Sequence, residues 1–393
     1  MNFGHPRRAD WALDPDVLYL NHGTVGATPR RVQAARRALL EELERQPATF
    51  LLRELTGVRV GGPRPDPPRM RVAAAAVATF LGARADDLAF VDNSTTGANA
   101  VLRSFPLGPG DEVLVTELGY GGVSNAARHA ARDRGASFRE VAVPEPWRGP
   151  ERILERLETE IGAATRILVV DHLTSGTALV LPIAEIVALC RRRGVAVLVD
   201  GAHAPASLDL RLPEIGADWY VGNLHKWAWA PISSGILWAA PERQADLHPA
   251  VVSWGLDRGL AMEFDLPGTR DPTPHLAAPE GIAMLREWGV AEVRNWNHRL
   301  AWQAAHLLAE RWGTRFEAPE SMIAGMAAVP LPASVEAGQE AAERLRDRLL
   351  HEDGIEVLVK TFQGRTWIRI SAQVYNELAD FERLGEAVAR KTG

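Results

Sequence analysis

Lysine is scarce in this sequence, and one lysine lies in a setting suited to covalent chemistry. The three lysines are Lys226, Lys360 and Lys391, and arginine supplies the other cations. Because arginine keeps its proton in proteins, a reaction that needs a neutral amine has only these three candidates. Lys226 lies between two strand-like runs, with Trp227 and Trp229 beside it. Burial there lowers the pKa of the ammonium group and favours a Schiff base with a carbonyl compound, whereas an isolated lysine is ordinarily a surface residue.

An acidic residue and a histidine near each other in the sequence could bind a cationic aromatic ring. Asp200 ends the apolar run VAVLVD, and a buried carboxylate needs a cationic partner. A protonated pyridine nitrogen is such a partner, and the charge pair turns the ring into an electron sink. His203 follows three residues later and could donate to a ring hydroxyl oxygen. A helix N-cap or a salt bridge for Asp200, and a structural role for His203, are the alternatives.

A third group of residues could bind a phosphate. Residues 94–99, STTGAN, are typical of a loop that opens a helix. The free N–H groups of a helix start, its positive end and the hydroxyls of Thr95 and Thr96 favour a phosphate there. A plain helix cap fits this short pattern equally well. The sequence has neither a GxGxxG dinucleotide motif nor a P-loop.

The elements that must position these residues alternate in type from about residue 30 to residue 240. Strand-like runs separated by helical patterns predict an α/β fold with a mainly parallel sheet and helices on both faces. The seven expected strands lie in 88–93, 112–118, 138–143, 167–173, 195–203, 219–223 and 234–240. Helical patterns cover 30–46, 68–81, 125–134, 151–161 and 183–193.

Polar residues follow five of these strand-like runs, at the points where strands should end. In parallel sheets, ligands bind beyond the carboxyl ends of the strands, so these groups should share one site. They lie in 93–97, 117–122, 171–172, 200–203 and 223–226.

The pattern changes after about residue 265. Residues 266–275 are rich in proline and indicate a loop, and a long helical region then covers about 277–312. A smaller α+β unit should follow, with a helix over 336–351 and strands over 355–359 and 366–371. We predict three parts. These are an N-terminal segment near the active site (1–28), a large cofactor-binding domain (29–265) and a small C-terminal domain that includes the linker and the long helix (266–393).

These motifs together resemble the class V aminotransferase family, a group of pyridoxal-phosphate (PLP) enzymes of fold type I. The similarity extends from LNHGTVG (20–26) to WIRISAQVYN (367–376), essentially the whole chain. Within the family, VDGAHAP (199–205), HKW (225–227) and VSW (252–254) resemble the isopenicillin N epimerases. The resemblance implies PLP as the cofactor. It also implies a mainly parallel seven-stranded sheet with helices on both faces, plus a smaller C-terminal α+β domain.

The resemblance also implies a role for individual residues around the cofactor. Lys226 would form the Schiff base, Asp200 would pair with the pyridine nitrogen and His203 would contact the ring hydroxyl oxygen. Tyr120 would stack on the ring, although some relatives stack a histidine nearer the glutamate, where this chain has Leu118. The phosphate would be held by Thr95, Thr96, Asn223 and His225.

Other implied roles concern the substrate and a second subunit. Arg369 resembles the arginine that binds the substrate α-carboxylate, for which a bidentate fork is suited; a surface charge at a strand end is the alternative. Thr269 would reach the phosphate of a neighbouring subunit, so the enzyme would be a homodimer with active sites at the interface. Asn21 and His22, on the substrate side, and Ser175, on the cofactor side, would lie near the site.

The implied chemistry takes place at the Cα atom of an amino-acid-like small molecule, with Lys226 as general base. Return of a proton on the opposite face gives epimerisation or racemisation and needs a second acid, for which Tyr120 is the candidate. Expulsion of a β- or γ-substituent gives a lyase, including a C–S lyase, and return of the proton to the cofactor gives an aminotransferase. We rank the epimerase and the lyase above the aminotransferase.

Cysteine desulfurases of this family need a nucleophilic cysteine on a C-terminal loop. The matching stretch, 357–367, has none, and the single cysteine, Cys190, lies in a helical pattern that indicates core packing. Transfer of sulfur to an enzyme thiol is therefore not expected.

A zinc metallohydrolase is the alternative class of enzyme. His172, His203 and His225, with Asp171 or Asp200, could ligate zinc in a metallohydrolase, but this interpretation leaves Lys226 unexplained and we expect no metal.

The composition argues against nucleic-acid binding and a membrane span. A net charge of -6 gives no basic surface for nucleic acid, and no apolar run reaches the about 18 residues of a membrane span. One cysteine cannot form an intramolecular disulfide, which indicates the cytoplasm.

Overall fold

A central sheet of seven strands has the order β2-β8-β7-β6-β5-β3-β4 in a computed structural model that describes residues 2–56 and 65–392. β8 runs antiparallel to both of its neighbours, and the remaining neighbours are parallel. The predicted mainly parallel seven-stranded sheet is therefore confirmed. Its strands are β2 (Leu88–Val91), β3 (Glu112–Thr116), β4 (Ser137–Val141), β5 (Thr165–Asp171), β6 (Ala196–Gly201), β7 (Trp219–Asn223) and β8 (Gly235–Ala239).

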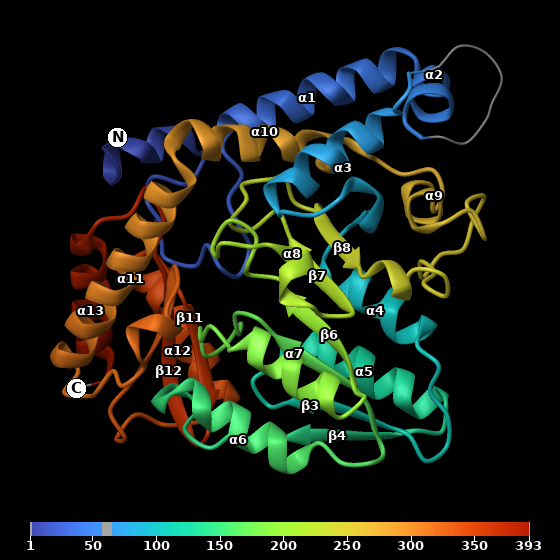
Figure 1. The fold of residues 1–393 in the computed structure, drawn as a ribbon. Coiled ribbons are helices and arrows are strands. Elements are labelled where there is room, and N and C mark those ends of the chain that lie inside the picture. Colours follow the sequence, from blue (N-terminus) through green and yellow to red (C-terminus); the bar gives the residue numbers. More distant parts are fainter. Residues whose placement is uncertain (1, 57–64, 393) are drawn as a thin grey trace.

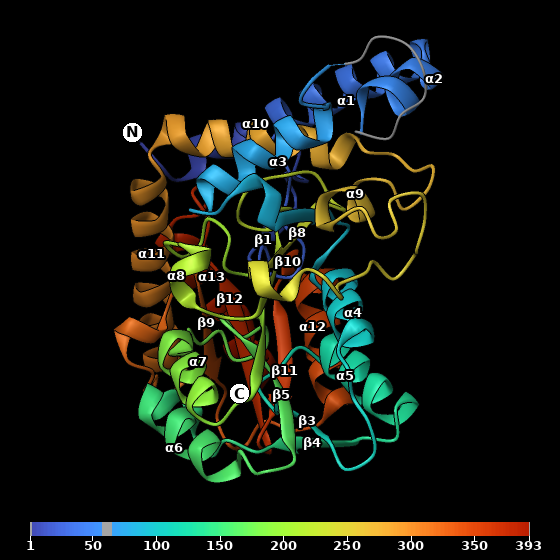
Figure 2. The ribbon, with the colours of Figure 1, turned by 45° about the vertical axis from the view of Figure 1, so that its right-hand side comes forward.

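Helices cover both faces of this sheet (Figure 2). On one face lie α4 (Ser94–Ser104) and α5 (Gly121–Asp133), and on the other lie α6 (Pro150–Glu160) and α7 (Ile183–Arg192). A strand buried on both sides is apolar at consecutive positions rather than at alternate ones. In β6, Val197 and Val199 belong to one hydrophobic cluster, and Leu198 between them belongs to the other.

A layer of three long helices lies beyond the β2 and β8 side of the sheet (Figure 1). α1 (Arg30–Arg45) and α3 (Arg69–Phe80) both pack against α10 (Thr273–Trp288). Short helices complete the large part of the fold: α2 (Pro47–Thr49), α8 (Leu212–Ile215) and α9 (Leu260–Asp265).

The long helical region expected over 277–312 is two helices, so that expectation was wrong in detail. α10 ends at Trp288 and α11 (Val290–Arg311) begins two residues later. Gly289 between them has φ 82, a left-handed conformation that glycine adopts without a steric penalty. The chain changes direction sharply there, as Figure 2 shows, and α11 then runs along the strand Met326–Pro330 of a second, smaller sheet.

A second sheet of three antiparallel strands has the order β11-β12-β9. Its register pairs Leu358 with Arg369 and Lys360 with Trp367. Directly paired residues point to the same face of a sheet, so these four side chains share one face. The strands are β9 (Met326–Pro330), β11 (Leu358–Phe362) and β12 (Arg365–Ser371), and α11, α12 (Gln339–Asp353) and α13 (Leu378–Thr392) pack around them.

The N-terminal segment joins the C-terminal part of the fold by a short parallel pairing. β1 (Leu18–Tyr19) pairs with β10 (Ile355–Glu356). A methyl group on Gly26 would lie 2.1 Å from the carbonyl oxygen of His225, so the segment runs directly against the backbone that carries Lys226.

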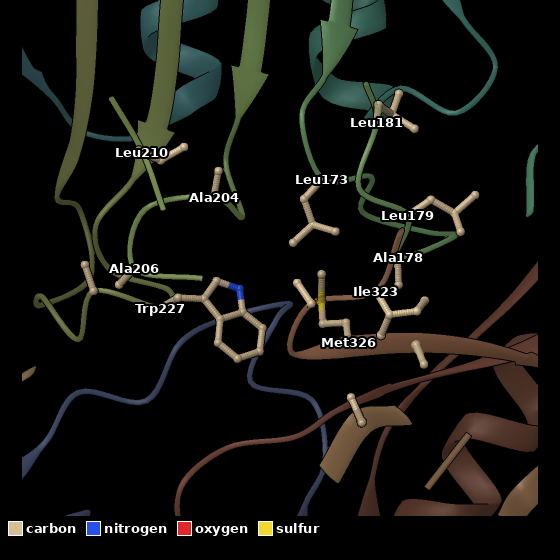
Figure 3. Packing of buried hydrophobic residues seen from close by; sticks show 14 of the residues in the cluster. Leu173, Ala178, Leu179, Leu181, Ala204, Ala206, Leu210, Trp227, Ile323 and Met326 are labelled. Carbon is tan, nitrogen blue, oxygen red and sulfur yellow. The ribbon is translucent and has the colours of Figure 1, made fainter. Parts of the chain in front are cut away.

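A buried hydrophobic cluster fills the space between the strand ends and the small sheet (Figure 3). Trp227, Leu173 and Met326 come from three different elements and meet in it. Since Trp227 is the residue after Lys226, this packing holds the lysine backbone in place. Among the helices of the described residues, none is long and apolar enough to cross a membrane.

Candidate active site

A cavity of about 620 Å³ opens at the carboxyl edge of the large sheet. All five polar groups expected at this edge contribute to its wall, and the small sheet adds one side. The wall consists of Thr24, Asn93, Ser94, Thr95, Thr96, Tyr120, Asp171, Ser175, Asp200, Ala202, His203, Asn223, His225, Lys226, Leu358 and Arg369.

Lys226 lies in the turn that follows β7, and its amine faces this cavity. Its Nζ atom lies 3.2 Å from His203 Nε2. Loss of hydration, followed by the positive charge of Arg369, lowers the pKa of Lys226 to about 7. A substantial fraction of the side chain is therefore a neutral amine near neutral pH. His22 Nε2 lies 3.0 Å from the Lys226 carbonyl oxygen and braces the turn from behind.

Asp200 and His203 each present a buried polar atom that has no partner within the described residues. Asp200 ends β6, and one carboxylate oxygen accepts the Ala202 N–H at 3.0 Å. The other oxygen, Oδ2, forms no hydrogen bond, and neither does His203 Nδ1. Burial raises the pKa of Asp200 and lowers that of His203. Unpaired buried groups are rare in folded proteins, so this pair is suited to a polar ring such as a pyridinium with a neighbouring hydroxyl.

The N-terminus of α4 forms one end of the cavity. Asn93 caps the helix by accepting the Thr96 N–H at 2.9 Å, and Asn223 Oδ1 accepts the Ser94 N–H at 2.8 Å. The Thr95 N–H and the Ser94 hydroxyl have no partner in the described part of the chain. Free donors at a helix N-terminus bind anions, so a phosphate fits here.

His225 is the remaining group expected to bind the phosphate. Its Nδ1 atom lies 3.0 Å from the Ser234 carbonyl oxygen, which fixes the ring at the same wall. Burial lowers the pKa of His225 to about 4, so the ring is neutral at pH 7.

Tyr120 and Asp171 line the cavity from the ends of two other elements. Tyr120 precedes α5 and is 49% exposed, and its N–H points to Asp171 Oδ1 at 3.4 Å. Asp171 ends β5 and is paired in register with Asp200 on β6. Burial, then the nearby Asp200 carboxylate, raises the pKa of Asp171. The sequence predicted Asp171 at this edge of the sheet, but only as a possible zinc ligand. Its hydrogen bond with the Tyr120 N–H joins residues far apart in the sequence, so the spacing of residues does not predict it.

Arg369 is fully buried at the side of the cavity formed by the small sheet. Its guanidinium donates to the Ser175 carbonyl oxygen (2.8 Å), Asn21 Oδ1 (2.9 Å) and Thr24 Oγ1 (2.6 Å). These acceptors are all neutral, the Nε atom has no partner in the described chain, and burial lowers the pKa of Arg369 to about 10. The surface-charge alternative for this residue is therefore wrong.

Three expected site residues lie outside the cavity wall. Asn21 and His22 contact Arg369 and Lys226 respectively from the outer side. Thr269 lines a neighbouring cavity, which it shares with Thr96 and Arg270. Thr24 and Leu358 line the active-site cavity and were not predicted, because a threonine in a loop and a leucine in a strand carry no distinctive signal.

The geometry does not support the zinc alternative. The His172 ring turns away from the cavity, with Nδ1 2.9 Å from the Tyr220 hydroxyl. Across residues 2–56 and 65–392, no three His, Cys, Asp or Glu side chains are grouped to hold a metal ion. Cys190 is buried inside α7 and does not reach the cavity.

Solved structures share this fold over nearly the whole chain. A cystine C–S lyase in complex with its product, cysteine persulfide, matches with a TM-score of 0.76 and 22% identity, covering 98% of this chain and 99% of the other. The cysteine desulfurase CsdA from Escherichia coli matches with a TM-score of 0.74 and 19% identity, covering 98% and 97%. The fold-type-I architecture is thereby confirmed.

Sequence comparison places the chain in a family. Isopenicillin N epimerase of Streptomyces clavuligerus is 33% identical over 411 residues, covering 98% of this chain and 99% of that protein. A probable chloroplastic L-cysteine desulfhydrase of Arabidopsis thaliana is 32% identical over 404 residues, covering 95% and 83%. The family model of aminotransferase class V matches residues 68–384. The chain therefore belongs to the class V aminotransferase family and is a pyridoxal-phosphate enzyme.

Proposed function

We propose that this enzyme removes the proton from Cα of an amino acid and then acts as an epimerase or as a C–S lyase. The observation that carries the proposal is the position of the Lys226 amine. It faces a cavity that also presents the unpaired Asp200 Oδ2 atom and the buried guanidinium of Arg369. A base, an anchor for an electron-withdrawing ring and an anchor for a carboxylate therefore share one space.

Residues from five parts of the fold would hold the cofactor. Asp200 Oδ2 would accept from the ring nitrogen, and His203 would contact the ring hydroxyl oxygen. Tyr120 and Ser175 would contact the ring and its surroundings from the wall of the cavity. When bound, PLP links covalently to an amino group and withdraws electrons from the neighbouring Cα. The phosphate would lie at the N-terminus of α4, held by Thr95, Thr96, Asn223 and His225.

Proton transfer would be carried by two residues. Lys226 Nζ takes the Cα proton, since its lowered pKa keeps much of the amine neutral. Epimerisation needs a donor for the other face of Cα. Tyr120 is the proposed donor, because it lines the same cavity and its hydroxyl forms no hydrogen bond within the described chain. Arg369 orients the substrate by its α-carboxylate.

The lyase branch needs no second acid at Cα. After Lys226 Nζ removes the proton, the electron pair of the Cα–H bond forms a Cα–Cβ double bond and the Cβ–S bond breaks. The sulfur leaves with its electrons as a thiolate. One relative is named an epimerase and another an L-cysteine desulfhydrase, and the two match the chain at similar identity. An aminotransferase remains the alternative, with the same residues in the first step.

Isotope exchange separates these branches. The enzyme is incubated with L- and D-amino acids in heavy water, and Cα–H exchange, product chirality, pyruvate and ammonia are measured. Exchange with inversion identifies an epimerase, and pyruvate with ammonia identifies a lyase. A tryptic peptide that contains Lys226 should be labelled after borohydride treatment of the PLP-loaded protein. Labelling of another lysine, or no exchange with any amino acid, would overturn the proposal.

The assembly and location of the enzyme are also proposals. A homodimer with shared active sites is supported by Thr269, which lines a cavity beside Thr96, and by exposed apolar residues nearby in the sequence. Trp254 is 79% exposed, and Val251 and Val252 are also exposed.

The single, buried Cys190 is consistent with a reducing compartment, and we place the enzyme in the cytoplasm. Its partner would be a small amino-acid-like substrate rather than a membrane or nucleic acid.

A further inference from the structure

Lys360 is the second of the three lysines, and it lies on the small sheet beside residues that line the active site. It lies on β11, two residues after Leu358, which lines the cavity beside Arg369. Residues two apart on a strand point to the same face, so Lys360, Leu358 and Arg369 face the same way. A methyl group on Gly176 would lie 2.3 Å from Lys360 Nζ. The ammonium group therefore lies against the loop that continues from Ser175.

Lys360 has no counter-ion in the described structure. Its ammonium forms neither an ion pair nor a hydrogen bond with any described residue. Asp171 and Glu117 are the carboxylates close enough to influence its pKa, but neither pairs with it. Asp171 accepts the Tyr120 N–H, and Glu117 accepts the Val143 N–H at 2.7 Å and the Gln363 amide at 2.8 Å.

Two cations therefore share this face of the small sheet, Arg369 in the cavity wall and Lys360 beside it, and neither forms an ion pair within the described chain. Arg369 donates only to neutral oxygens. Burial lowers the pKa of Lys360; the Asp171 carboxylate opposes this shift, and the charge of Arg369 adds to it. Holding two partly buried like charges near each other is unfavourable unless an anion balances them. One α-carboxylate would satisfy Arg369 and leave Lys360 without an anionic partner, because the only side-chain contact of its ammonium group among the described residues is with the Phe362 ring, at 5.9 Å from the centroid.

We propose that Lys360 is a specificity-determining residue that binds a second anionic group, a carboxylate on the side chain of the amino-acid substrate, while Arg369 binds the α-carboxylate. This inference rests on the proposed function and adds the substrate class, α-amino acids with an acidic side chain. Recognition of a charged group by a partly desolvated ammonium discriminates strongly against a neutral analogue, because the analogue leaves the ammonium unpaired.

Equilibrium binding to the PLP-loaded enzyme tests this inference. Glutarate carries two carboxylates and butyrate carries one, and neither has an amino group that could react. Calorimetry of wild type should give a Kd for glutarate about 10- to 100-fold lower than for butyrate. Lys360→Gln should remove this preference without changing the Kd for butyrate, and Lys360→Arg should keep most of it. Lys391→Gln is the matched control, because Lys391 pairs with Glu352 and Asp353 far from the cavity, and it should bind both ligands as wild type does.

Kinetics provide a second measurement. With an acidic amino acid, Lys360→Gln should raise KM by about 10-fold or more and leave kcat nearly unchanged, since Lys226 still moves the proton. Equal affinity of wild type for glutarate and butyrate, or an unchanged preference in Lys360→Gln, would overturn the inference. Borohydride labelling of Lys226 is measured on the same preparations. If labelling succeeds and the glutarate preference is absent, only the role of Lys360 fails; if labelling fails, the proposed function fails.

Discussion

Burial changes the pKa values of Lys226 and Asp200 in opposite directions, and each change bears on the role proposed for the residue. The same loss of water lowers the pKa of the lysine and raises that of the aspartate. Burial therefore favours the neutral form of each group until a partner arrives. For Asp200 a ring cation would be that partner and would draw its pKa down again, whereas Lys226 needs its neutral form in order to react.

The lowered pKa of Lys226 predicts a pH dependence for cofactor attachment. Only the neutral amine can attack an aldehyde, and its fraction rises as pH increases through about 7. The rate of attachment to apoenzyme should therefore rise about tenfold from pH 6 to pH 8 and level off above. Stopped-flow absorbance of the PLP–lysine band measures this rate. A rate that continues to rise tenfold per unit up to pH 10 would indicate an ordinary lysine.

Replacement of Asp200 tests the ring anchor. Asp200→Asn keeps the shape but removes the charge that would pair with the ring nitrogen. We expect kcat to fall about 10²- to 10³-fold, with PLP still attached to Lys226. Asp209→Asn is the control, because Asp209 is an exposed aspartate whose side chain pairs with Arg294. Steady-state kinetics measure both variants, and a loss of less than threefold in Asp200→Asn would contradict the assigned role.

The N-terminal segment is the element whose packing bears most directly on the lysine. Gly26→Ala adds a methyl group that would lie 2.1 Å from the His225 carbonyl oxygen and 2.6 Å from Lys226 Cα. Relief of this overlap must move the segment or the lysine turn, at a cost of about 1–3 kcal/mol. We expect a lower Tm and weaker PLP binding, measured by calorimetry and by absorbance titration. Gly162→Ala has open space around its methyl position, so the control should keep both values.

Most elements of the large sheet were predictable because their physical cause is local. Strands such as β6 are buried on both faces, and their residues are apolar at consecutive positions. Two features could not be predicted. β1 has only two residues, which is too short for any periodicity, and the single strand expected over 355–359 is divided into β10, which pairs with β1, and the start of β11. The break at Gly289 was missed because a glycine within a helical pattern is often tolerated.

The candidate site was predictable to the extent that its residues follow strands. Lys226, Asp200, His203 and Thr95 reach the cavity because parallel strands end at a common edge. Leu358 reaches it, and Lys360 lies beside it, only through the register of β11 on β12 and the position of the small sheet. These positions depend on packing between segments far apart in the sequence, and the spacing of residues within one segment does not predict such packing.

At the scale of the whole molecule, the exposed apolar segment predicts a dimer. Trp254, at 79% exposure, would be unusual on an isolated surface beside Val251 and Val252. Sedimentation of wild type should give twice the chain mass of 42.9 kDa. Trp254→Ser combined with Val252→Ser should shift the equilibrium toward the single chain. If Thr269 of the partner subunit contacts the phosphate as proposed, PLP binding should weaken as well. A wild-type mass of 42.9 kDa at all concentrations would exclude the dimer.

The pairing of β1 with β10 has a consequence for the order of events during translation. β1 leaves the ribosome long before β10, and Asn21 and Thr24 can hold Arg369 only after β12 has also emerged. A nascent chain can thus complete its large sheet and present Lys226 while its carboxylate anchor is still missing. An unfinished polypeptide would accept the aldehyde and yet be unable to orient an amino acid. Competence for turnover would be acquired only at the end of synthesis.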